Sequence, residues 1–419
     1  MDLSGPARQQ SIYLSGFAGT MPVVPIDYAK LEEQALRQMA PEVAAYIAGG
    51  AGGGSTMRAN IQAFDQYKVL PRMLRDVSVR DMSIDLFGER LPAPLLLSPI
   101  GVAGMVHPEA DIAIGKAAAT LGVPYIFSNQ ASKPMEEVAA AMGQSPRWFQ
   151  LYWSKSNELV ASFVQRAERS GCKAIVVTLD TTLLGWRTQD LELAYLPFLL
   201  GKGIAQYTSD PVFQKLMNEP SPPASRSISI HAINGLLHMV GNYPGGGFIT
   251  RLLSGRPIKA VQKFIQLYSN PALTWHDLAY LREITKLPVL LKGILRADDA
   301  RKALDHGMNG IIVSNHGGRQ VDGSISTLQA LPPIVEAING EIPVLMDSGI
   351  RHGADIFKAL ALGANAVCIG RPYVYGLALA GQQGVQAVIQ NLMAEFDLTM
   401  GLCGCKNIAE INRDMIIGR

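Results

Sequence analysis

Eight short apolar runs recur from about residue 94 onward, and segments with helical periodicity separate them. The runs are rich in Val, Ile and Leu, and several begin at a proline or after a Gly-Ala turn, which is typical of strands buried on both faces. Repeated strand–helix units form a parallel sheet, and eight of them close into a barrel. An α/β fold, the (β/α)8 or TIM barrel, is therefore predicted. The runs cover residues 94–100, 124–129, 147–153, 174–180, 288–294, 310–316, 343–349 and 366–372.

The segments between the runs have the apolar spacing of amphipathic helices. Four of these predicted helices cover residues 109–121, 157–170, 298–306 and 353–362. Another helical segment, residues 28–48, precedes the first run. We expect this N-terminal helical segment to cover the bottom of the barrel.

One connection is much longer than the others. The fourth run ends near Asp180 and the fifth begins near Pro288, and the segment between them includes a Pro-rich stretch at 221–226 and a Gly-rich stretch at 243–247. Long insertions after a barrel strand lie over the carboxyl ends of the strands and often act as lids. We expect one barrel domain over residues 1–419, with residues 181–287 as an inserted lid region.

The composition excludes several classes of function. The chain has 37 basic and 35 acidic residues, so its net charge of +2 gives no basis for nucleic acid as a partner. Its four cysteines indicate a reducing compartment, and Cys403 and Cys405 have no second Cys/His cluster with which to form a metal site.

The apolar stretches also argue against a membrane. No signal peptide is recognised at the N-terminus, and no apolar stretch is long enough to cross a bilayer. The apolar stretches 235–241 and 248–253 of the insert are too short and too weakly charged to favour membrane docking. A cytoplasmic protein without a membrane partner is expected.

Polar residues end seven of the eight runs, which is where the active site of such a barrel lies. A single buried polar residue is usually a structural one, but each costs energy unless it is partnered, and seven polar strand ends on one rim indicate a functional site. These residues are Ser128, Asn129, Gln150, Tyr152, Thr178, Asp180, Lys292, Ser314, His316, Asp347 and Arg371.

Residues 314–320, SNHGGRQ, follow the sixth run and form the strongest local motif. The two glycines permit a tight turn, so that His316 and Arg319 can point into one pocket. Histidine supplies a base near neutral pH, and the arginine fork binds a carboxylate bidentately. The motif therefore favours proton abstraction from a substrate that carries a carboxylate over the alternative of a Gly-rich surface turn.

The loops after the last two runs indicate a phosphate site. Residues 347–353, DSGIRHG, and 370–372, GRP, combine glycines and arginines at the position where this architecture binds phosphate. A phosphate-bearing cofactor is predicted. The Gly-rich segment 49–54 lacks the strand–turn–helix context of a dinucleotide fingerprint and is interpreted as a loop.

These motifs resemble those of the FMN-dependent L-2-hydroxy acid oxidases and dehydrogenases. SNHGGRQ, LKG, DSGIR and GRP occur in the order found in that family, and the similarity extends from about Ile26 to Gly401. Within the family the lactate 2-monooxygenase type is the most similar, through stretches such as 46–50, 185–187 and 210–215. The resemblance implies FMN as cofactor, a small 2-hydroxy acid and O2 as partners, and a homo-oligomer.

The resemblance also implies a role for each residue that matches a motif. His316 would be the active-site base, Arg187 and Arg319 would bind the substrate carboxylate, and Tyr46 and Tyr152 would hydrogen-bond the substrate. The expected catalytic set is His316, Lys292, Tyr152 and Arg319, with Lys292 as a fixed cation beside the flavin. The expected cofactor-binding residues are Pro99, Ile100, Gly101, Ser128, Gln150, Thr178, Lys292, Ser314, Asp347, Gly349, Arg351, Gly370 and Arg371. No metal is expected.

The reaction expected is the oxidation of a short L-2-hydroxy acid, first of all L-lactate. Side chains can take the proton but none accepts a hydride, so the flavin is required. With O2 as acceptor, the resemblance and Gly101 favour oxidative decarboxylation to the shortened acid, an outcome that requires retention of the keto acid under the lid. The alternatives are an oxidase that releases keto acid and H2O2, a dehydrogenase with a quinone or carrier acceptor, and a non-catalytic flavin-binding barrel.

Three features of the sequence bear on these alternatives. Gly101 stands where oxidases of the family tend to have Ala and the monooxygenase has Gly, although a packing role would explain it equally. Gln130 replaces an aromatic or apolar residue near the substrate's side chain, which leaves a more polar substrate open. Residues 220–270 of the lid region have no match in the relatives considered.

Overall fold

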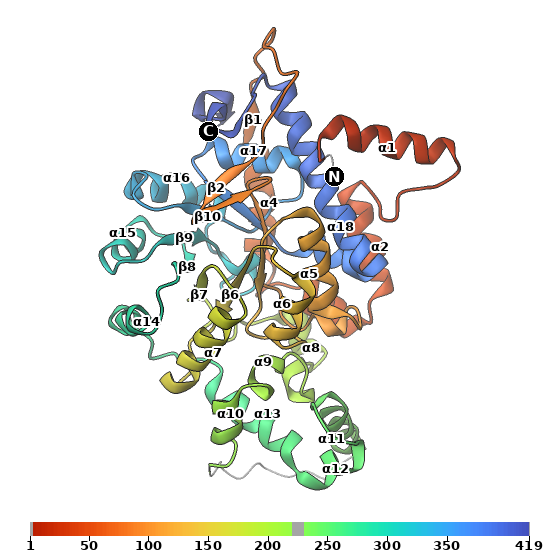
Figure 1. The fold of residues 1–419 in the computed structure, drawn as a ribbon, viewed down its shortest axis with the longest axis vertical. Helices are drawn as coiled ribbons and strands as arrows, with labels where there is room; N and C mark the ends of the chain where they lie inside the picture. Colours follow the sequence, from red (N-terminus) through yellow and green to blue (C-terminus); the bar gives the residue numbers. More distant parts are fainter. Residues whose placement is uncertain (1–2, 220–229, 419) are drawn as a thin grey trace.

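The computed structural model describes residues 3–219 and 230–418. Eight parallel strands form a closed barrel in the order β10-β11-β4-β5-β6-β7-β8-β9, so the predicted TIM barrel is confirmed (Figure 1). Most strands end two or three residues before the predicted runs do, because the chain leaves the hydrogen-bonded ladder to form the rim loops. The barrel strands are β4 (Leu95–Leu97), β5 (Tyr125–Phe127), β6 (Arg147–Leu151), β7 (Ile175–Thr178), β8 (Val289–Ile294), β9 (Gly310–Val313), β10 (Val344–Met346) and β11 (Ala366–Ile369).

The strands are buried on both faces, as their apolar runs predict. Successive side chains of a strand point to opposite faces. Alternate residues such as Leu96, Ile126 and Trp148 fill the barrel interior, while Leu95, Leu97 and their counterparts pack against the surrounding helices.

The helices that follow the strands form the outer layer (Figure 1). The four predicted between the runs are confirmed as α5, α7, α15 and α17, with ends within one residue of those expected. In α7 the cap is local, since the Ser156 side chain accepts from the backbone N–H of Leu159. The helices after the strands are α5 (Ala110–Leu121), α6 (Met135–Met142), α7 (Asn157–Arg169), α14 (Leu278–Ile284), α15 (Ala297–Asp305), α16 (Thr327–Ile338), α17 (Gly353–Ala361) and α18 (Arg371–Leu402).

The N-terminal segment differs from the expectation. Residues 28–48 form two helices, α2 (Tyr28–Gln38) and α3 (Pro41–Ala48), because Pro41 holds Ala40 in an extended conformation and begins a new helix. The prediction that this segment covers the barrel bottom is wrong for α3, which lies at the opposite end, where Tyr46 lines the pocket at the carboxyl ends of the strands.

A β-hairpin closes the bottom instead. The strands β2 (Ile84–Leu86) and β3 (Glu89–Leu91) pair antiparallel, and the Phe87 ring at their turn packs edge-on against Trp148 with centroids 5.6 Å apart. Leu86 and Leu91 complete the interior cluster of the barrel. The remaining elements outside the insert are α1 (Gly5–Phe17), α4 (Ser55–Asp65), β1 (Tyr67–Val69), η1 (Ala103–Met105), η4 (His316–Gly318), η5 (Ile408–Glu410), η6 (Arg413–Met415) and β12 (Ile416–Gly418).

The insert between β7 and β8 forms a helical lobe at one end of the molecule (Figure 1). The Pro-rich stretch 221–226 lies outside the described residues, and the Gly-rich stretch 243–247 connects two of the helices. Where the structure describes the chain, no helix is long and apolar enough to span a membrane. The elements of the lobe are α8 (Thr188–Glu192), η2 (Pro197–Leu200), α9 (Ala205–Thr208), α10 (Pro211–Leu216), α11 (Ile230–Asn242), α12 (Phe248–Ser254), α13 (Arg256–Leu267) and η3 (Trp275–Asp277).

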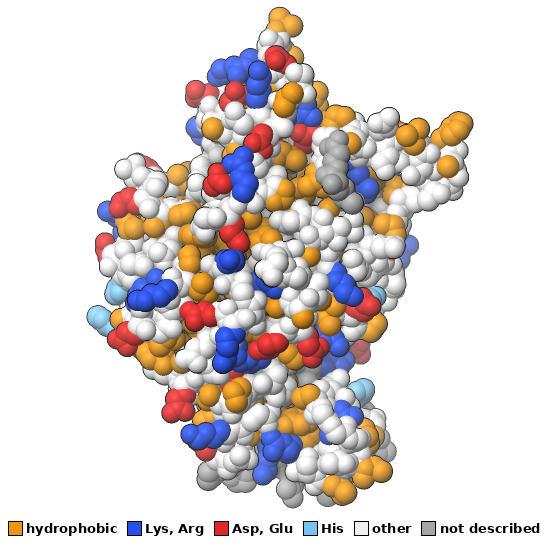
Figure 2. Space-filling model, in the orientation of Figure 1, with side chains coloured by type: hydrophobic (Ala, Val, Ile, Leu, Met, Phe, Trp, Pro, Cys, Tyr) orange, Lys and Arg blue, Asp and Glu red, His pale blue; other side chains and the backbone are white. Residues whose placement is uncertain are grey.

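One face of the molecule shows no separation of charged groups by sign (Figure 2). On the face shown in Figure 2, basic and acidic side chains are interspersed among apolar and neutral ones. This distribution agrees with the small net charge of +2.

Candidate active site

A pocket of about 1080 Å³, including space open to solvent, lies at the carboxyl ends of the barrel strands. The insert contributes Leu184, Phe198 and Tyr268 to its wall. The rest is lined largely by residues expected from the sequence, namely Tyr46, Pro99, Ile100, Gly101, Ser128, Tyr152, Arg187, Lys292, His316, Arg319, Asp347, Gly349, Arg351, Gly370 and Arg371. The other three do not line the pocket: Gln150 and Ser314 are buried against the lining residues Ser128 and Lys292, and Thr178 is buried behind Gln150.

The motif 314–320 turns as its glycines predict. His316, Gly317 and Gly318 have φ values of +58°, +66° and +75°, so three successive residues are left-handed. A Cβ on Gly318 would lie 2.7 Å from the backbone nitrogen of Met57, which excludes any larger residue there. The turn brings both His316 and Arg319 onto the pocket wall.

His316 is held by a carboxylate. Its Nδ1 lies 2.7 Å from Oδ1 of Asp180 and 3.2 Å from the hydroxyl of Thr181, which also hydrogen-bonds Asp180. With Nδ1–H donating to Asp180, the other ring nitrogen, Nε2, is the acceptor that remains for a group in the pocket.

The electrostatics of this pair favour a neutral imidazole beside an ionised carboxylate. Burial lowers the pKa of His316; Asp180 opposes this, Lys292 and Arg187 add to it, and the net direction is downward. Burial raises the pKa of Asp180, but the neighbouring His316 and Lys292 outweigh burial and lower it to about 2. His316 can therefore accept a proton near neutral pH, and Asp180 stabilises the imidazolium that forms.

Sequence reasoning noted Asp180 as a polar strand end but gave it no role. Its pairing with His316 bridges the ends of β7 and β9, which are separated in the barrel by β8. Gly293 (φ +109°) leaves room for the Asp180 side chain, because a Cβ at Gly293 would lie 2.9 Å from the Cβ of Asp180. Gly293 lies at a register irregularity in β8. In the sequence, the glycine of the LKG motif, Gly293, was the feature that could have indicated a close approach of Asp180 to this strand.

Arg187 and Arg319 lie together in the wall of the pocket that also contains His316. Arg319 donates from Nη1 to the carbonyl oxygens of Tyr46 and Gly49 (3.0 Å to the latter), and its guanidinium lies 4.9 Å from the centre of the Tyr46 ring. Its remaining donors, Nε and Nη2, make no hydrogen bond to any residue that the structure describes. Arg187 donates from Nη2 to Gln320 at 3.2 Å.

The paired arginines form an anion site. Burial, and after it the positive charge of Arg187, lowers the pKa of Arg319 to about 9. A carboxylate bound between the two guanidinium groups relieves this repulsion and accepts the free donors of Arg319 bidentately. Both residues line the pocket, and the free donors of Arg319 make the pair a candidate site for a carboxylate.

Tyr152 is a buried hydroxyl donor on the same wall. Burial, and then the charge of Asp180, raises the pKa of Tyr152 to about 12, so its hydroxyl stays protonated. Its backbone nitrogen donates to the side chain of Asn129 at 2.8 Å, which fixes the chain beside β6.

Lys292 provides a buried cation at the floor of the pocket. Its Nζ lies 3.0 Å from Oδ2 of Asp347 and donates to Ser314 at 2.8 Å. Burial opposes its charge, but Asp347 and then Asp180 outweigh burial, so that the pKa of Lys292 is raised above its ordinary value. Lys292 is therefore a fixed positive charge at the pH of any assay.

Polar side chains behind the wall support Ser128. The hydroxyl of Ser128 donates to Gln150 Oε1 at 3.3 Å, and Gln150 Nε2 donates to the hydroxyl of Thr178 at 3.0 Å. All three are buried, and Gln150 and Thr178 hold the hydroxyl of Ser128 through this chain of hydrogen bonds.

The opposite end of the pocket is built to receive a phosphate. Gly349 has φ +90°, and a Cβ there would lie 2.2 Å from the carbonyl oxygen of Asn60. The helix α18 begins at Arg371, and Gly370 and Arg371 at its N-terminus line the pocket, where the positive end of the helix dipole favours an anion. Arg371 donates to the carbonyl oxygens of Ile47 and Gly317 at 3.1 and 3.0 Å, which orients its guanidinium.

Arg351 contributes an unsatisfied donor to this end. Its Nε is buried and has no hydrogen-bond partner among the described residues, and its guanidinium lies 4.8 Å from the centre of the Tyr28 ring. A buried, unpaired arginine nitrogen indicates that an anion completes the site. Together with the Lys292 cation, these groups fit FMN: Arg351 and Arg371 would hold its phosphate, and Lys292 would supply a positive charge beside the flavin.

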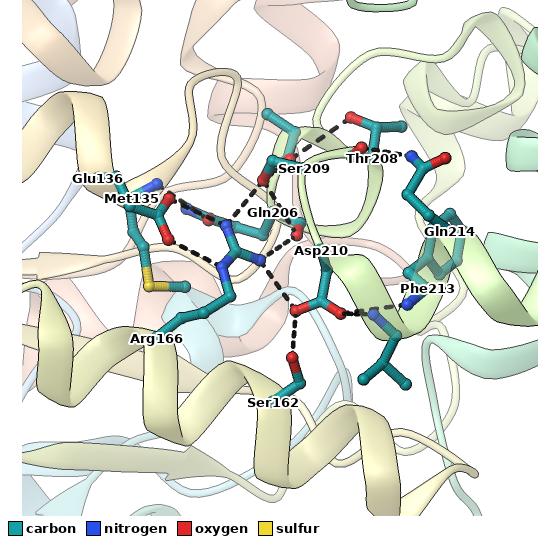
Figure 3. Close-up of polar contacts among 12 residues, drawn as sticks. Met135, Glu136, Ser162, Arg166, Gln206, Thr208, Ser209, Asp210, Phe213 and Gln214 are labelled. Carbon is teal, nitrogen blue, oxygen red and sulfur yellow. Dashed lines mark hydrogen bonds and ion pairs between the residues drawn. The ribbon is translucent and has the colours of Figure 1, made fainter.

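The insert is fastened to the barrel by a buried arginine. Arg166 of α7 donates to Asp210 at 3.1 Å and to the carbonyl oxygen of Gln206 at 2.7 Å, and it forms an ion pair with Glu136 of α6 at 2.8 Å (Figure 3). Asp210 also accepts from Ser162 at 2.8 Å. The network fixes the base of the lobe that supplies wall residues to the pocket, and the sequence analysis did not identify it.

The two adjacent cysteines near the C-terminus play no part in this site. Cys403 and Cys405 are buried free thiols. Within residues 3–219 and 230–418, no group of three or more His, Cys, Asp or Glu side chains is arranged to hold a metal ion.

A barrel with a flavin-binding cradle, a histidine base and an arginine pair defines the class of FMN-dependent enzymes that oxidise 2-hydroxy acids. The family described as FMN-dependent dehydrogenase matches residues 35–418. The chain belongs to this family, and FMN is its cofactor.

Individual relatives are similar over nearly the whole chain. L-lactate oxidase of Lysinibacillus sphaericus is 42% identical over 384 residues, which cover 92% of this chain and 90% of the relative. 2-Hydroxyacid oxidase 1 of Mus musculus is 38% identical, with 88% of this chain and 90% of the relative covered. A crystal structure of mandelate oxidase is 34% identical, with a TM-score of 0.74 and coverage of 93% of this chain and 98% of that one.

The named relatives change one expectation. They are oxidases, so they favour the oxidase alternative over the lactate 2-monooxygenase type that the sequence led us to expect.

Proposed function

We propose that this protein oxidises a short L-2-hydroxy acid with FMN and O2 and releases the 2-keto acid and hydrogen peroxide. The observation that carries this proposal is the placement of His316, held by Asp180 at 2.7 Å, in one pocket with the Arg187–Arg319 pair. A base beside a carboxylate site is what the removal of a proton from a 2-hydroxy acid requires.

Each residue has a distinct task in this proposal. The free donors of Arg319, with Arg187, bind the substrate carboxylate and so place C2 beside His316. Tyr46 and Tyr152 hydrogen-bond the substrate, and Nε2 of His316 takes a proton, from the hydroxyl in a hydride route or from C2 in a carbanion route. No side chain here accepts the two electrons; FMN, when bound, would supply that acceptor, with O2 as the final acceptor. Lys292 supplies the positive charge that stabilises added negative charge nearby.

The oxidase outcome is supported by the relatives, and the packing of Gly101 removes one argument for the monooxygenase outcome. A Cβ at residue 101 would lie 3.2 Å from both the Cβ and the carbonyl oxygen of Gln130. This contact accounts for Gly101 without reference to the electron acceptor, so the residue no longer favours the monooxygenase outcome.

Two other outcomes have a specific observation in their favour. The insert residues Leu184, Phe198 and Tyr268 on the pocket wall would favour oxidative decarboxylation to the shortened acid if they retain the keto acid. A relative named FMN-dependent alpha-hydroxy acid dehydrogenase qulF, from Penicillium citrinum, is 40% identical over 407 residues and favours a non-oxygen acceptor. A non-catalytic barrel has no such support, since all four expected catalytic residues line one pocket.

Product analysis tests the proposal. The purified holoenzyme is incubated in air with L-lactate and with other short L-2-hydroxy acids, and keto acid, shortened acid and peroxide are quantified together. Keto acid and peroxide in equal amounts are expected. Acetate from L-lactate with little peroxide would instead establish the monooxygenase, and turnover only with an added quinone or dye would establish the dehydrogenase.

Two further expectations remain predictions. The homo-oligomer implied by the family resemblance is tested by light scattering on the eluting protein. The cytoplasmic location is tested by tagging the protein and imaging it in cells. A peroxisomal location is the alternative, because one relative from Arabidopsis thaliana, 38% identical, is named as peroxisomal.

A further inference from the structure

Gln130 lines the pocket, and its side-chain amide has no hydrogen-bond partner among the described residues, so the amide is open to the molecule that displaces water there. Only 8% of the residue is exposed, and it belongs to the pocket wall. Neither the oxygen nor the nitrogen of its side-chain amide makes a hydrogen bond to any residue that the structure describes. A primary amide offers two donors and an acceptor, and leaving them unmet in a buried site is unfavourable. The side chain therefore needs a polar partner from the molecule that fills the pocket.

The backbone of Gln130 cannot turn the side chain away. Its N–H donates to the hydroxyl of Ser128 at 3.1 Å, and its carbonyl oxygen accepts from the N–H of Val102 at 2.9 Å. From the insert, the backbone N–H of Ala205 donates to the carbonyl oxygen of Ala131 at 3.2 Å. The loop after β5 is thus held by the loop after β4 on one side and by the insert on the other.

Gln130 lies at the substrate end of the pocket rather than at the phosphate end. A Cβ on Gly203 would touch both the Gln130 carbonyl oxygen, at 3.1 Å, and the ring of Phe198, at 3.2 Å, so these groups are neighbours. The Phe198 ring packs edge-on against Tyr46 at 6.5 Å, and Tyr46 in turn lies under Arg319. A substrate whose carboxylate is bound by Arg319 extends its side chain along this wall.

The charges around the pocket restrict the group that Gln130 would bind. The nearby cations Arg187 and Arg319 are assigned to the carboxylate on C1, and an amide compensates a second carboxylate poorly. A neutral group that donates or accepts a hydrogen bond, such as a hydroxyl or a carboxamide, matches the amide of Gln130 best.

We propose that Gln130 hydrogen-bonds a neutral polar group on the side chain of the substrate, so that the enzyme prefers L-2-hydroxy acids with a hydroxyl or carboxamide there over apolar ones of the same shape. This inference rests on the proposed oxidation of L-2-hydroxy acids and names the substrate class of that site.

Isosteric substrates test the preference. L-glycerate and L-2-hydroxybutyrate differ by a hydroxyl in place of a methyl group, and the β-amide of L-malate and L-2-hydroxy-4-methylpentanoate differ by a carboxamide in place of an isopropyl group. The wild-type holoenzyme is expected to favour the polar member of at least one pair by about tenfold or more in kcat/KM, because the apolar member leaves the buried amide unpaired.

The variant Gln130→Met keeps the length of the side chain and removes the amide. It is expected to abolish or reverse the ratio of kcat/KM within the preferred pair. The ratio is the readout because it cancels differences in flavin content and in the amount of folded enzyme. If the wild type favours the apolar member of both pairs, or if Gln130→Met leaves the ratio unchanged, the inference is wrong while the proposed oxidation stands.

A binding measurement separates this inference from the proposed function. If the holoenzyme oxidises none of the four acids, the proposed oxidation has failed for these compounds. Hydroxypyruvate and 2-oxobutyrate, which are the keto acids of the first pair, are then compared by calorimetry on the same holoenzyme and on Gln130→Met. Tighter binding of hydroxypyruvate by the wild type alone supports the role of Gln130, and equal binding of both by both proteins overturns it.

Discussion

Asp180 binds the imidazole of His316 through Nδ1, and this leaves Nε2 for the substrate. The same carboxylate is one of the groups that keep Lys292 charged, so a single buried residue couples the base to the cation at the floor of the pocket. The arginine pair differs from the pair of His316 and Asp180, because it places two positive charges close together in a buried site. Arg319 also keeps donors that bind no described residue. At the scale of residues, the base therefore has its partner within the chain, whereas the arginine pair is suited to bind an anion.

Replacing His316 tests its role as the base. We expect His316→Gln to retain FMN and to lower the rate of flavin reduction by about 10²–10⁴-fold, the usual contribution of a general base. The rate is measured by stopped-flow absorbance without O2. Flavin reduction at the wild-type rate would contradict the assignment.

The pH profile tests the pairing of His316 with Asp180. His316 must be neutral to act, and its pKa is lowered, so kcat/KM should fall only as the pH drops through a value below the ordinary range of histidine. Asp180 raises that pKa, so Asp180→Asn should move the acid limb to still lower pH as well as reducing the plateau rate. Asp298→Asn, at an exposed carboxylate on α15, serves as control. An acid limb that moves to higher pH would contradict the pairing.

Arg319→Met tests the carboxylate site. We expect the substrate to bind more weakly by ~2–5 kcal/mol, the cost of removing one member of a buried charge pair. Affinity is measured with a keto acid that the enzyme cannot oxidise. The control is Arg296→Met, since that arginine is 73% exposed and pairs only with a neighbouring aspartate. Equal affinity in Arg319→Met and the control would mean that the carboxylate is bound elsewhere.

At the scale of elements, the features set by local sequence were predictable and those set by long-range packing were not. The strands were found because buried parallel strands have a short apolar signature, and the phosphate cradle because its glycines directly follow two of them. The side of the barrel covered by α3 depends on contacts far along the chain. The same holds for Asp180, whose pairing with His316 exists only once β7, β8 and β9 lie side by side.

Gly349→Ala tests the phosphate cradle. The added Cβ would lie 2.2 Å from the carbonyl oxygen of Asn60, on a residue with φ +90°, so we expect loss of bound FMN and a clear drop in the thermal midpoint. Gly340→Ala is the matched control, because Gly340 has φ +77° with nothing within 4 Å. The control should lose only ~1–2 kcal/mol of stability, for the left-handed backbone alone. Equal effects in the two variants would contradict a steric requirement at Gly349.

The anchor of the insert is tested by Arg166→Met. Asp210 is fully buried and would lose its cationic partner, so we expect a loss of about 3–5 kcal/mol in the free energy of unfolding and faster proteolysis within residues 181–287. Arg169→Met, at an exposed position on the same helix, should change neither. Proteolysis of the insert at the same rate in both variants would show that Arg166 does not hold the lobe.

At the scale of the whole molecule, the barrel brings the ends of eight strands to one rim, and the insert adds a wall to the pocket there (Figure 1). His316 and Arg319 follow β9, Arg187 comes from the insert, and the phosphate cradle follows β10 and β11. Each motif fixes only a residue type and a local turn, and barrel closure converts them into one site. We expect the substrate's side chain to contact the loop after β5 and the insert, which are the parts of the chain that the family motifs define least.

The most direct test of the central claim is the anaerobic reduction of the holoenzyme by single enantiomers. The flavin absorbance is followed after mixing with the L or the D form of lactate, 2-hydroxybutyrate and glycerate, and air is then admitted. We predict that L forms bleach the flavin, that D forms do not, and that air restores the colour with one peroxide formed per keto acid. A flavin that stays oxidised with every L form would contradict the claim that this pocket oxidises 2-hydroxy acids.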